Sequence, residues 1–145
     1  MEEFAIWGLG LAVLLAVFIG IILLPTIFYL LTLQKTLEEV SQENALMPPG
    51  QVWLILIPVF GAIWSFIVVE RIANSLEAEF AQRGMEIAEK RPGYSIGMAY
   101  CVLNILFFVP LAGIAGIVCW IIYWVKVNDY KTMLSQERIA RKKAE

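Results

Sequence analysis

The chain has 145 residues, of which 60% are hydrophobic and 17% are charged, and its formal net charge is -2. Ordinary soluble domains are about 45–50% apolar and about 25% charged. The composition therefore excludes a typical soluble domain and a disordered chain, and it indicates an all-α integral membrane protein. With no strongly basic face, it predicts no nucleic-acid partner.

The first apolar run extends from Phe4 to Leu33 and contains no charged residue. Its helical length of about 45 Å exceeds the roughly 30 Å hydrocarbon core, which favours one tilted helix that projects from the membrane. Pro25 is expected to kink this helix or to mark its exit from the acyl region. Residues 34–47 are expected to extend the helix as a stalk, until Pro48-Pro49-Gly50 breaks it.

The second apolar run, Val52 to Val69, is long enough for one span and contains Pro58. The polar stretch 70–91 follows. Its apolar residues recur every four positions, which predicts a helix over 70–83 whose stripe lies either on the membrane surface or against another helix: Ile72, Leu76 and Phe80. Gly84 is the expected end of that helix.

The last apolar run, Tyr94 to Val127, fits either one very long helix or a hairpin that turns near Pro110. A hairpin places ten of the 11 basic residues on one side of the membrane, whereas a single helix divides them seven to four. The positive-inside rule favours the hairpin. We therefore predict a four-helix bundle made of two hairpins in one domain, with spans 4–33, 52–69, 94–109 and 111–127.

In this prediction both termini and the loop 70–91 are cytoplasmic, and the tail 128–145 is a helical extension. Trp7, Trp120 and Trp124 would lie at the inner interface and Trp53 at the outer one.

Small residues at helical spacing are the strongest pattern in the chain, because they let two helices approach closely. On the first helix they form a run that we call the small-residue ridge: Gly8, Ala12, Ala16 and Gly20. Shorter pairs occur on the later helices: Gly61 with Ser65, and Ala112 with Gly116. The ridge serves either packing within one chain or self-association.

Polar groups inside the predicted spans are scarce. No acidic residue lies in a span interior, which argues against a proton-coupled transporter. Asn104 is the one strongly polar side chain well inside a span, and an interhelical hydrogen bond near Gly116 is its favoured role. The alternative is a small channel or transporter in which Asn104, Tyr100 and Thr26 line a pore.

The remaining candidates for chemistry also have plainer interpretations. Cys101 and Cys119 lie in apolar runs and are interpreted as packing residues, and no metal or cofactor site is predicted. A polar cluster is expected at the cytoplasmic border, where such groups usually anchor helix ends: Glu70, Arg71, Lys126 and Asp129. In the tail, Glu137 and Arg141 are expected to form an i,i+4 pair.

Four segments resemble a group of small bacterial membrane proteins of the Bacteroidetes type, a family with no assigned activity. They are residues 49–60 (PGQVWLILIPVF), 64–69 (WSFIVV), 71–76 (RIANSL) and 120–126 (WIIYWVK). The resemblance covers roughly residues 30–135, with Gly61 and Ser65 in place of an asparagine and a bulkier polar residue. It implies a bacterial inner membrane and adds no catalytic residue.

These observations together predict a non-enzymatic, multi-pass membrane protein that contacts the lipid bilayer. Its expected partners are further copies of itself or other membrane proteins, for which it would be a subunit or scaffold.

Overall fold

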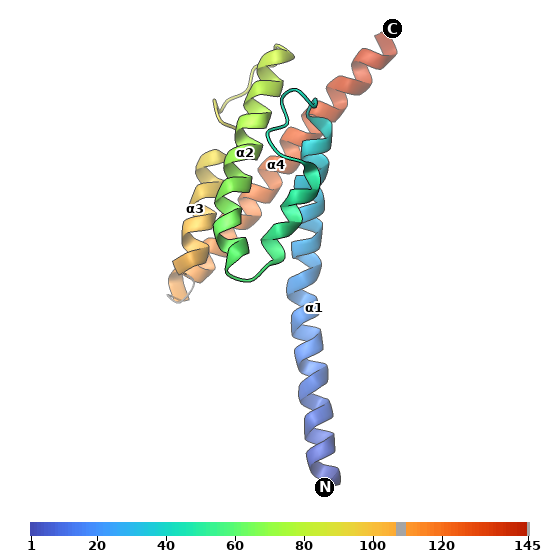
Figure 1. The fold of residues 1–145 in the computed structure, drawn as a ribbon, viewed down its shortest axis with the longest axis vertical. Coiled ribbons are helices and arrows are strands. Elements are labelled where there is room, and N and C mark those ends of the chain that lie inside the picture. Colours follow the sequence, from blue (N-terminus) through green and yellow to red (C-terminus); the bar gives the residue numbers. More distant parts are fainter. Residues whose placement is uncertain (107–109, 145) are drawn as a thin grey trace. The chain divides into compact units, whose positions relative to one another are not determined.

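The computed structural model describes residues 1–106 and 110–144, and this part of the chain is helical with no strand. The elements are α1 (Glu2–Glu39), the 3-10 helix η1 (Pro49–Leu56), α2 (Phe60–Gln82), α3 (Tyr94–Ile105) and α4 (Pro110–Ala144), as labelled in Figure 1. The chain divides into two compact units, Met1–Leu31 and Thr32–Glu145. Within the described residues, two helices are long and apolar enough to cross a membrane: α1 and the Leu111–Ala144 part of α4.

The first unit is one apolar helix. Residues 1–19 are all exposed, and the helix continues through Pro25 without interruption. The expected single long helix is thus confirmed. It ends at Glu39, well before the Pro48-Pro49-Gly50 break that the sequence suggested. The reason is a contact with α2, because the Ser41 backbone N–H donates to the Glu79 carboxylate at 3.0 Å and not to a helical carbonyl.

The stretch 52–69 is not the single helix that its apolar run suggested, and this expectation is corrected. Its first part belongs to η1, residues 57–59 form a turn, and only its second part belongs to α2. Ile57 precedes a proline and is extended, with φ -75° and ψ 118°, as the clash with the proline ring requires. Pro58 therefore ends a helix here and does not lie within one.

The turn that follows is tight. The Phe60 backbone N–H donates to the Pro58 carbonyl at 2.7 Å, and Val59 between them has φ 64° and ψ -58°. This is a γ-turn of the strained hand, which a β-branched residue rarely adopts. The turn folds η1 back against α2, so that η1 and the first part of α2 form a short helical hairpin, which we call the first hairpin.

Glycines set how closely the helices of this unit approach one another. A Cβ atom at Gly61 would lie 1.9 Å from the Ile55 carbonyl oxygen, so η1 and α2 meet backbone to backbone. A Cβ atom at Gly97 would lie 2.6 Å from the Val69 side chain and 2.8 Å from that of Tyr123. The small residue at each position is therefore required by packing within one chain.

The polar stretch after the second apolar run is helical to Gln82, and Gly84 follows with φ +66°. The stripe of Ile72, Leu76 and Phe80 is fully buried, and the Phe80 ring meets the Tyr130 ring of α4 edge-on, with centroids 5.8 Å apart. Of the two locations left open for this stripe, the structure selects packing against another helix.

The expected hairpin in the last apolar run is confirmed: α3 ends at Ile105 and α4 begins at Pro110, while residues 107–109 lie outside the described part of the chain. We call α3 and the first part of α4 the second hairpin. Gly116 of α4 faces α3 in this hairpin, and a Cβ atom added there would lie 3.4 Å from the Leu103 Cβ atom. The tail is helical as expected, because α4 continues to Ala144.

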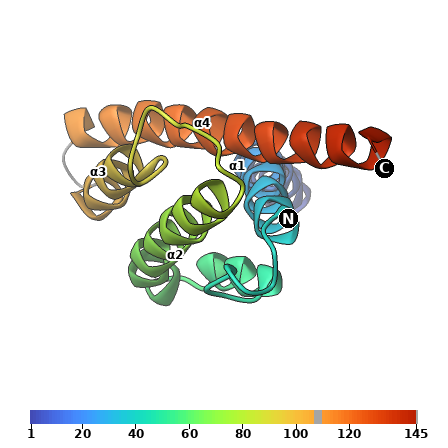
Figure 2. The ribbon, with the colours of Figure 1, turned by 90° about the horizontal axis from the view of Figure 1, so that it is seen from above.

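The two hairpins turn at the same end of the Thr32–Glu145 unit. Gly97 of α3 lies against Val69 of α2 and Tyr123 of α4, so the three residues share one level of the unit. From that level, the hairpin turns lie toward lower residue numbers along α2 and α4 and toward higher residue numbers along α3. Figures 1 and 2 show α2, α3 and the first part of α4 side by side, and Figure 1 shows the start of α2, the end of α3 and the start of α4 at one end. Apolar side chains there are exposed, foremost Val59 at 83% and Leu111 at 80%.

Candidate functional site

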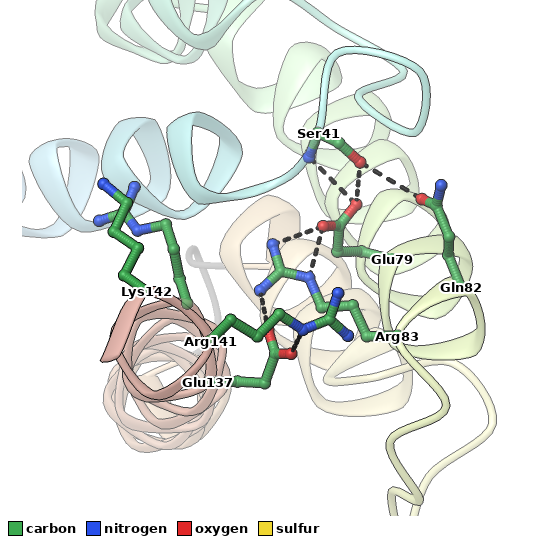
Figure 3. A pocket seen from close by; sticks show the side chains of 8 residues that line it. Ser41, Glu79, Gln82, Arg83, Glu137, Arg141 and Lys142 are labelled. Atoms are coloured by element: carbon green, nitrogen blue, oxygen red, sulfur yellow. Dashed lines mark hydrogen bonds and ion pairs between the residues drawn. The ribbon is translucent and has the colours of Figure 1, made fainter. Parts of the chain in front are cut away.

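The opposite end of this unit is polar. A cleft of about 530 Å³ lies there, where the segment after α1, the end of α2 and the tail of α4 meet (Figure 3). We call it the polar cleft; it is lined by Ser41, Glu79, Gln82, Arg83, Glu137, Arg138, Arg141 and Lys142.

Glu79 is the buried centre of the polar cleft, with only 2% of its surface exposed. Its carboxylate accepts hydrogen bonds from the Ser41 N–H at 3.0 Å, the Ser41 hydroxyl at 2.5 Å and the Asn44 amide at 2.8 Å. Burial by itself would raise the pKa of Glu79, but these hydrogen bonds and that from Arg83 outweigh it and hold the pKa below its usual value. The group therefore stays ionised.

Arg83 joins three segments of the chain. Its guanidinium pairs with Glu79 at 2.6 Å and with Glu137 of α4 at 2.7 Å, and it also donates to the Glu39 and Leu134 carbonyls at 3.1 Å each. Burial opposes its charge, but the two carboxylates outweigh that and raise its pKa. A planar guanidinium with several fixed donors suits such a junction better than a lysine ammonium would.

Further ion pairs complete the junction. Arg138 pairs with Glu39 at 3.0 Å, and Arg141 pairs with Glu137, so the expected i,i+4 pair of the tail is confirmed. Leu46 is tied to α2 through both backbone groups, because its N–H donates to the Ser75 hydroxyl at 3.0 Å and its carbonyl accepts from Arg71 at 2.6 Å. Residues 39–46 are therefore fastened to α2 and α4.

Glu79 is held in place as a hydrogen-bond acceptor. A carboxylate that is ionised, buried and bonded to four donor groups is a weak base, so Glu79 does not activate the Ser41 hydroxyl. Two carboxylates, Glu79 and Glu137, line the cleft together with four cations, Arg83, Arg138, Arg141 and Lys142. Among residues 1–106 and 110–144, no three of the histidine, cysteine, aspartate and glutamate side chains are grouped to hold a metal ion. The ion pairs and hydrogen bonds of the polar cleft join the end of α1, α2 and α4.

The predicted border cluster is not brought together. Glu70 lies 3.8 Å from Arg91, whereas Arg71 bonds to Leu46, and Lys126 pairs with Glu89. Asp129 is exposed. Lys126 and the Gly93 N–H lower the pKa of Glu89 against the effect of its burial. Glu70, Arg71 and Lys126 thus each contact a different part of the chain.

The predicted intramembrane polar residue does not face an interior. Asn104 is exposed on α3. A Cβ atom added at Gly116 would lie 3.8 Å from the Asn104 backbone N, so the two residues lie at the same depth, as expected. The Asn104 side-chain amide, however, does not occupy the space beside Gly116. Tyr100 is half-buried, and the Thr26 hydroxyl donates to the Ile22 carbonyl of its own helix at 2.8 Å. None of these observations favours a pore.

The small residues fall into two groups. Gly61 and Gly116 pack within the chain, Ser65 is buried with its hydroxyl bonded to the Gly61 carbonyl at 2.7 Å, and Ala112 is half-buried. The small-residue ridge is different, since an added Cβ atom at Gly8 or Gly20 would meet no atom within 4 Å. Cys101 and Cys119 are free thiols.

Two tryptophans have a role that the sequence did not reveal. The Trp53 indole donates to the Gln34 side chain at 2.7 Å, and the Trp124 indole donates to the Thr32 hydroxyl at 2.9 Å. Since Thr32 and Gln34 are two residues apart on α1, Trp53 and Trp124 lie at nearly one level of the unit. The expectation that they mark opposite membrane interfaces is therefore corrected.

Comparison of the chain with protein-family models, with curated proteins and with solved structures gives no match.

Proposed function

We propose that this protein is a non-catalytic membrane component that α1 anchors and that self-associates through the small-residue ridge. The observation that carries the proposal is the surface of the first unit, where residues 1–19 are exposed along a helix whose run from Phe4 to Leu33 bears no charge. Such a surface is stable only in lipid or against another apolar helix. The bacterial inner membrane implied by the family resemblance is its proposed setting.

The ridge favours a second copy of the chain as the neighbour. In lipid, helices associate by close packing where small residues let their backbones approach. Gly8 and Gly20 are open to such an approach. The other small residues, such as Gly61, are already used inside the chain. A different membrane protein with a matching helix is the alternative partner, and the protein would then be its subunit or scaffold.

Two observations support a structural role over a catalytic or ion-coupled one. The apolar runs contain no Asp, Glu, Lys or Arg, and the buried Glu79 and Arg83 of the polar cleft are held in ion pairs that join segments of the chain.

The test compares leucine substitutions on two faces of α1. Gly8→Leu with Ala12→Leu fills the ridge, whereas Gly10→Leu makes the same kind of change about 140° away from the middle of the ridge, at 3.6 residues per turn. Gly10 is equally open, so it is a matched control. We expect the ridge variant to associate at least about tenfold more weakly, a loss of about 1.4 kcal/mol, in mild detergent and in vesicles. Equal association of both variants would contradict the ridge.

A further inference from the structure

We infer that only α1 crosses the membrane, and that the two hairpins of the Thr32–Glu145 unit dip into the bilayer from the side that carries the polar cleft and return to it. This inference rests on the proposed membrane setting but not on self-association. The partner of the exposed hairpin turns is then the acyl region of the bilayer, entered from one leaflet.

The uncharged helical segments of the two hairpins are shorter than the hydrocarbon core of a bilayer. The uncharged part of α2 before Glu70 has a length of about 15 Å, and α3 has a length of about 18 Å, at 1.5 Å per residue. The hydrocarbon core is about 30 Å thick, so these elements reach about its middle and do not cross it. The uncharged part of α4, from Pro110 to Val125, is longer, at about 24 Å. Because α4 as a whole is long and apolar enough to cross a membrane, for α4 the inference rests on its packing against the short α3.

Residues 41–46 are in contact with α2. In a four-span arrangement residues 41–46 would lie on the outer side of the membrane and residues 70–91 on the cytoplasmic side. The Ser41 N–H and the Glu79 carboxylate are 3.0 Å apart, and the Leu46 N–H and the Ser75 hydroxyl are also 3.0 Å apart. No bilayer fits between groups in contact, so both segments lie on one side.

Charged residues are absent from the hairpins and concentrated on one side of α1's apolar run. The hairpins have no charged residue from position 50 to 69 or from 93 to 125, and all 11 basic residues follow α1's apolar run, beginning with Lys35. With residues 39–46 on the same side as the other loops, the basic residues divide eleven to none, compared with ten to one for four spans. The positive-inside rule therefore places the polar cleft in the cytoplasm and Glu2 and Glu3 outside.

Polar and apolar surface lie at different ends of the unit. Val59 and the α4 residue Leu111 are exposed at one end, and nearby positions continue the apolar surface: Leu56, Ile57, Phe60, Ile63, Ile105, Leu106 and Ile114. At the other end lie the ion pairs of the polar cleft. Trp53 and Trp124 lie between them at one level, which matches a single aromatic belt at one membrane interface. Irregular backbone is tolerated at membrane depth where the protein packs around it, as η1 packs on α2 at Gly61.

The test is the sidedness of single cysteines in a chain that carries Cys101→Ala and Cys119→Ala. Exposed reporter positions are Gln42, Glu86 and Glu3, where substitution disturbs no buried contact. A membrane-impermeant maleimide is applied to sealed membranes of both orientations. We expect Gln42→Cys and Glu86→Cys to react from the same, cytoplasmic side and Glu3→Cys from the other.

Depth is tested with Val59→Cys and Leu111→Cys, which we expect to be protected from both sides until detergent is added. Reaction of Gln42→Cys and Glu86→Cys from opposite sides would overturn the inference, and so would reaction of Leu111→Cys from outside, because both are the signature of four spans. Extraction of the whole chain by alkaline carbonate would overturn the membrane setting itself. Unchanged association of the ridge variant would affect only the proposed function.

Discussion

Gly61→Ala tests the close contact that makes the first hairpin. The added Cβ atom would lie 1.9 Å from the Ile55 carbonyl oxygen, 2.6 Å from its carbonyl carbon and 3.1 Å from its Cα atom. All three are backbone atoms, so no side-chain rotation relieves the clash. Since ordinary contact begins at 3.4 Å, η1 must retreat from α2 by about 1.5 Å.

The energetic effect has two parts. Overpacking of this kind costs typically about 1–3 kcal/mol, and sometimes more where only backbone can move. Replacing a helical glycine with alanine returns about 1 kcal/mol of helix propensity. Gly116→Ala is the matched control, because its nearest neighbour would lie at 3.4 Å and only the propensity gain applies. The propensity gain is common to both variants and cancels, so we expect Gly61→Ala to be about 1–3 kcal/mol less stable than Gly116→Ala.

The assay is reversible unfolding in mild detergent, followed by tryptophan fluorescence, for both variants and the parent chain. Equal midpoints for Gly61→Ala and Gly116→Ala would refute the reasoning, because they would show that η1 does not pack on α2 at this point.

Three further predictions use the same unfolding measurement. Glu79→Gln should lower the free energy of unfolding at pH 7 by about 2–4 kcal/mol, because Arg83 keeps its charge while losing a buried partner. Since the pKa of Glu79 is lowered by folding, its contribution is present above the ordinary value of 4.5 and is lost as the pH falls below it, and Glu79→Gln should remove this part of the acid dependence. Val59→Gly should raise the stability by about 0.5–1 kcal/mol by relieving the positive φ, and Val59→Ala should raise it less; a loss in both would contradict a strained turn. Asn104→Leu should change it by no more than about 0.5 kcal/mol, and a larger loss would mean that the amide has a buried partner.

Where a sequence pattern reports local structure, it predicted this fold well. The four-residue period of Ile72, Leu76 and Phe80 requires a helix with a buried face, and that face is fully covered. The turn near Pro110 followed from charge balance, and α3 and α4 meet there as a hairpin.

The stretch 52–69 shows the limit of such patterns. An apolar run of this length has the same composition whether it crosses the membrane once or folds back on itself, because both states bury it in lipid. Pro58 and Gly61 were the available signals: the proline forbids continuation of the helix before it, and the glycine permits a close return. Both were visible in the sequence, and only the backbone contact at Ile55 gives them this meaning.

The polar cleft could not be found from the sequence, because its members are far apart in the chain. Ser41, Glu79 and Glu137 each look like ordinary residues of a solvated polar stretch, where charges usually face water. Their contact depends on the fold bringing three segments together around Arg83. Gly97 was missed for the same reason, since the tight space around it is formed by Val69 and Tyr123 from two other helices.

The claim that the first hairpin returns to the side of the membrane from which it enters is tested most directly at Asn44 and Gln82, whose side chains are in contact. Cysteines at both positions, in the cysteine-free background and in intact membranes, should be joined within one chain by a short bifunctional thiol reagent. Absence of the cross-link, with both thiols reactive toward maleimide from opposite sides of the membrane, would contradict the account.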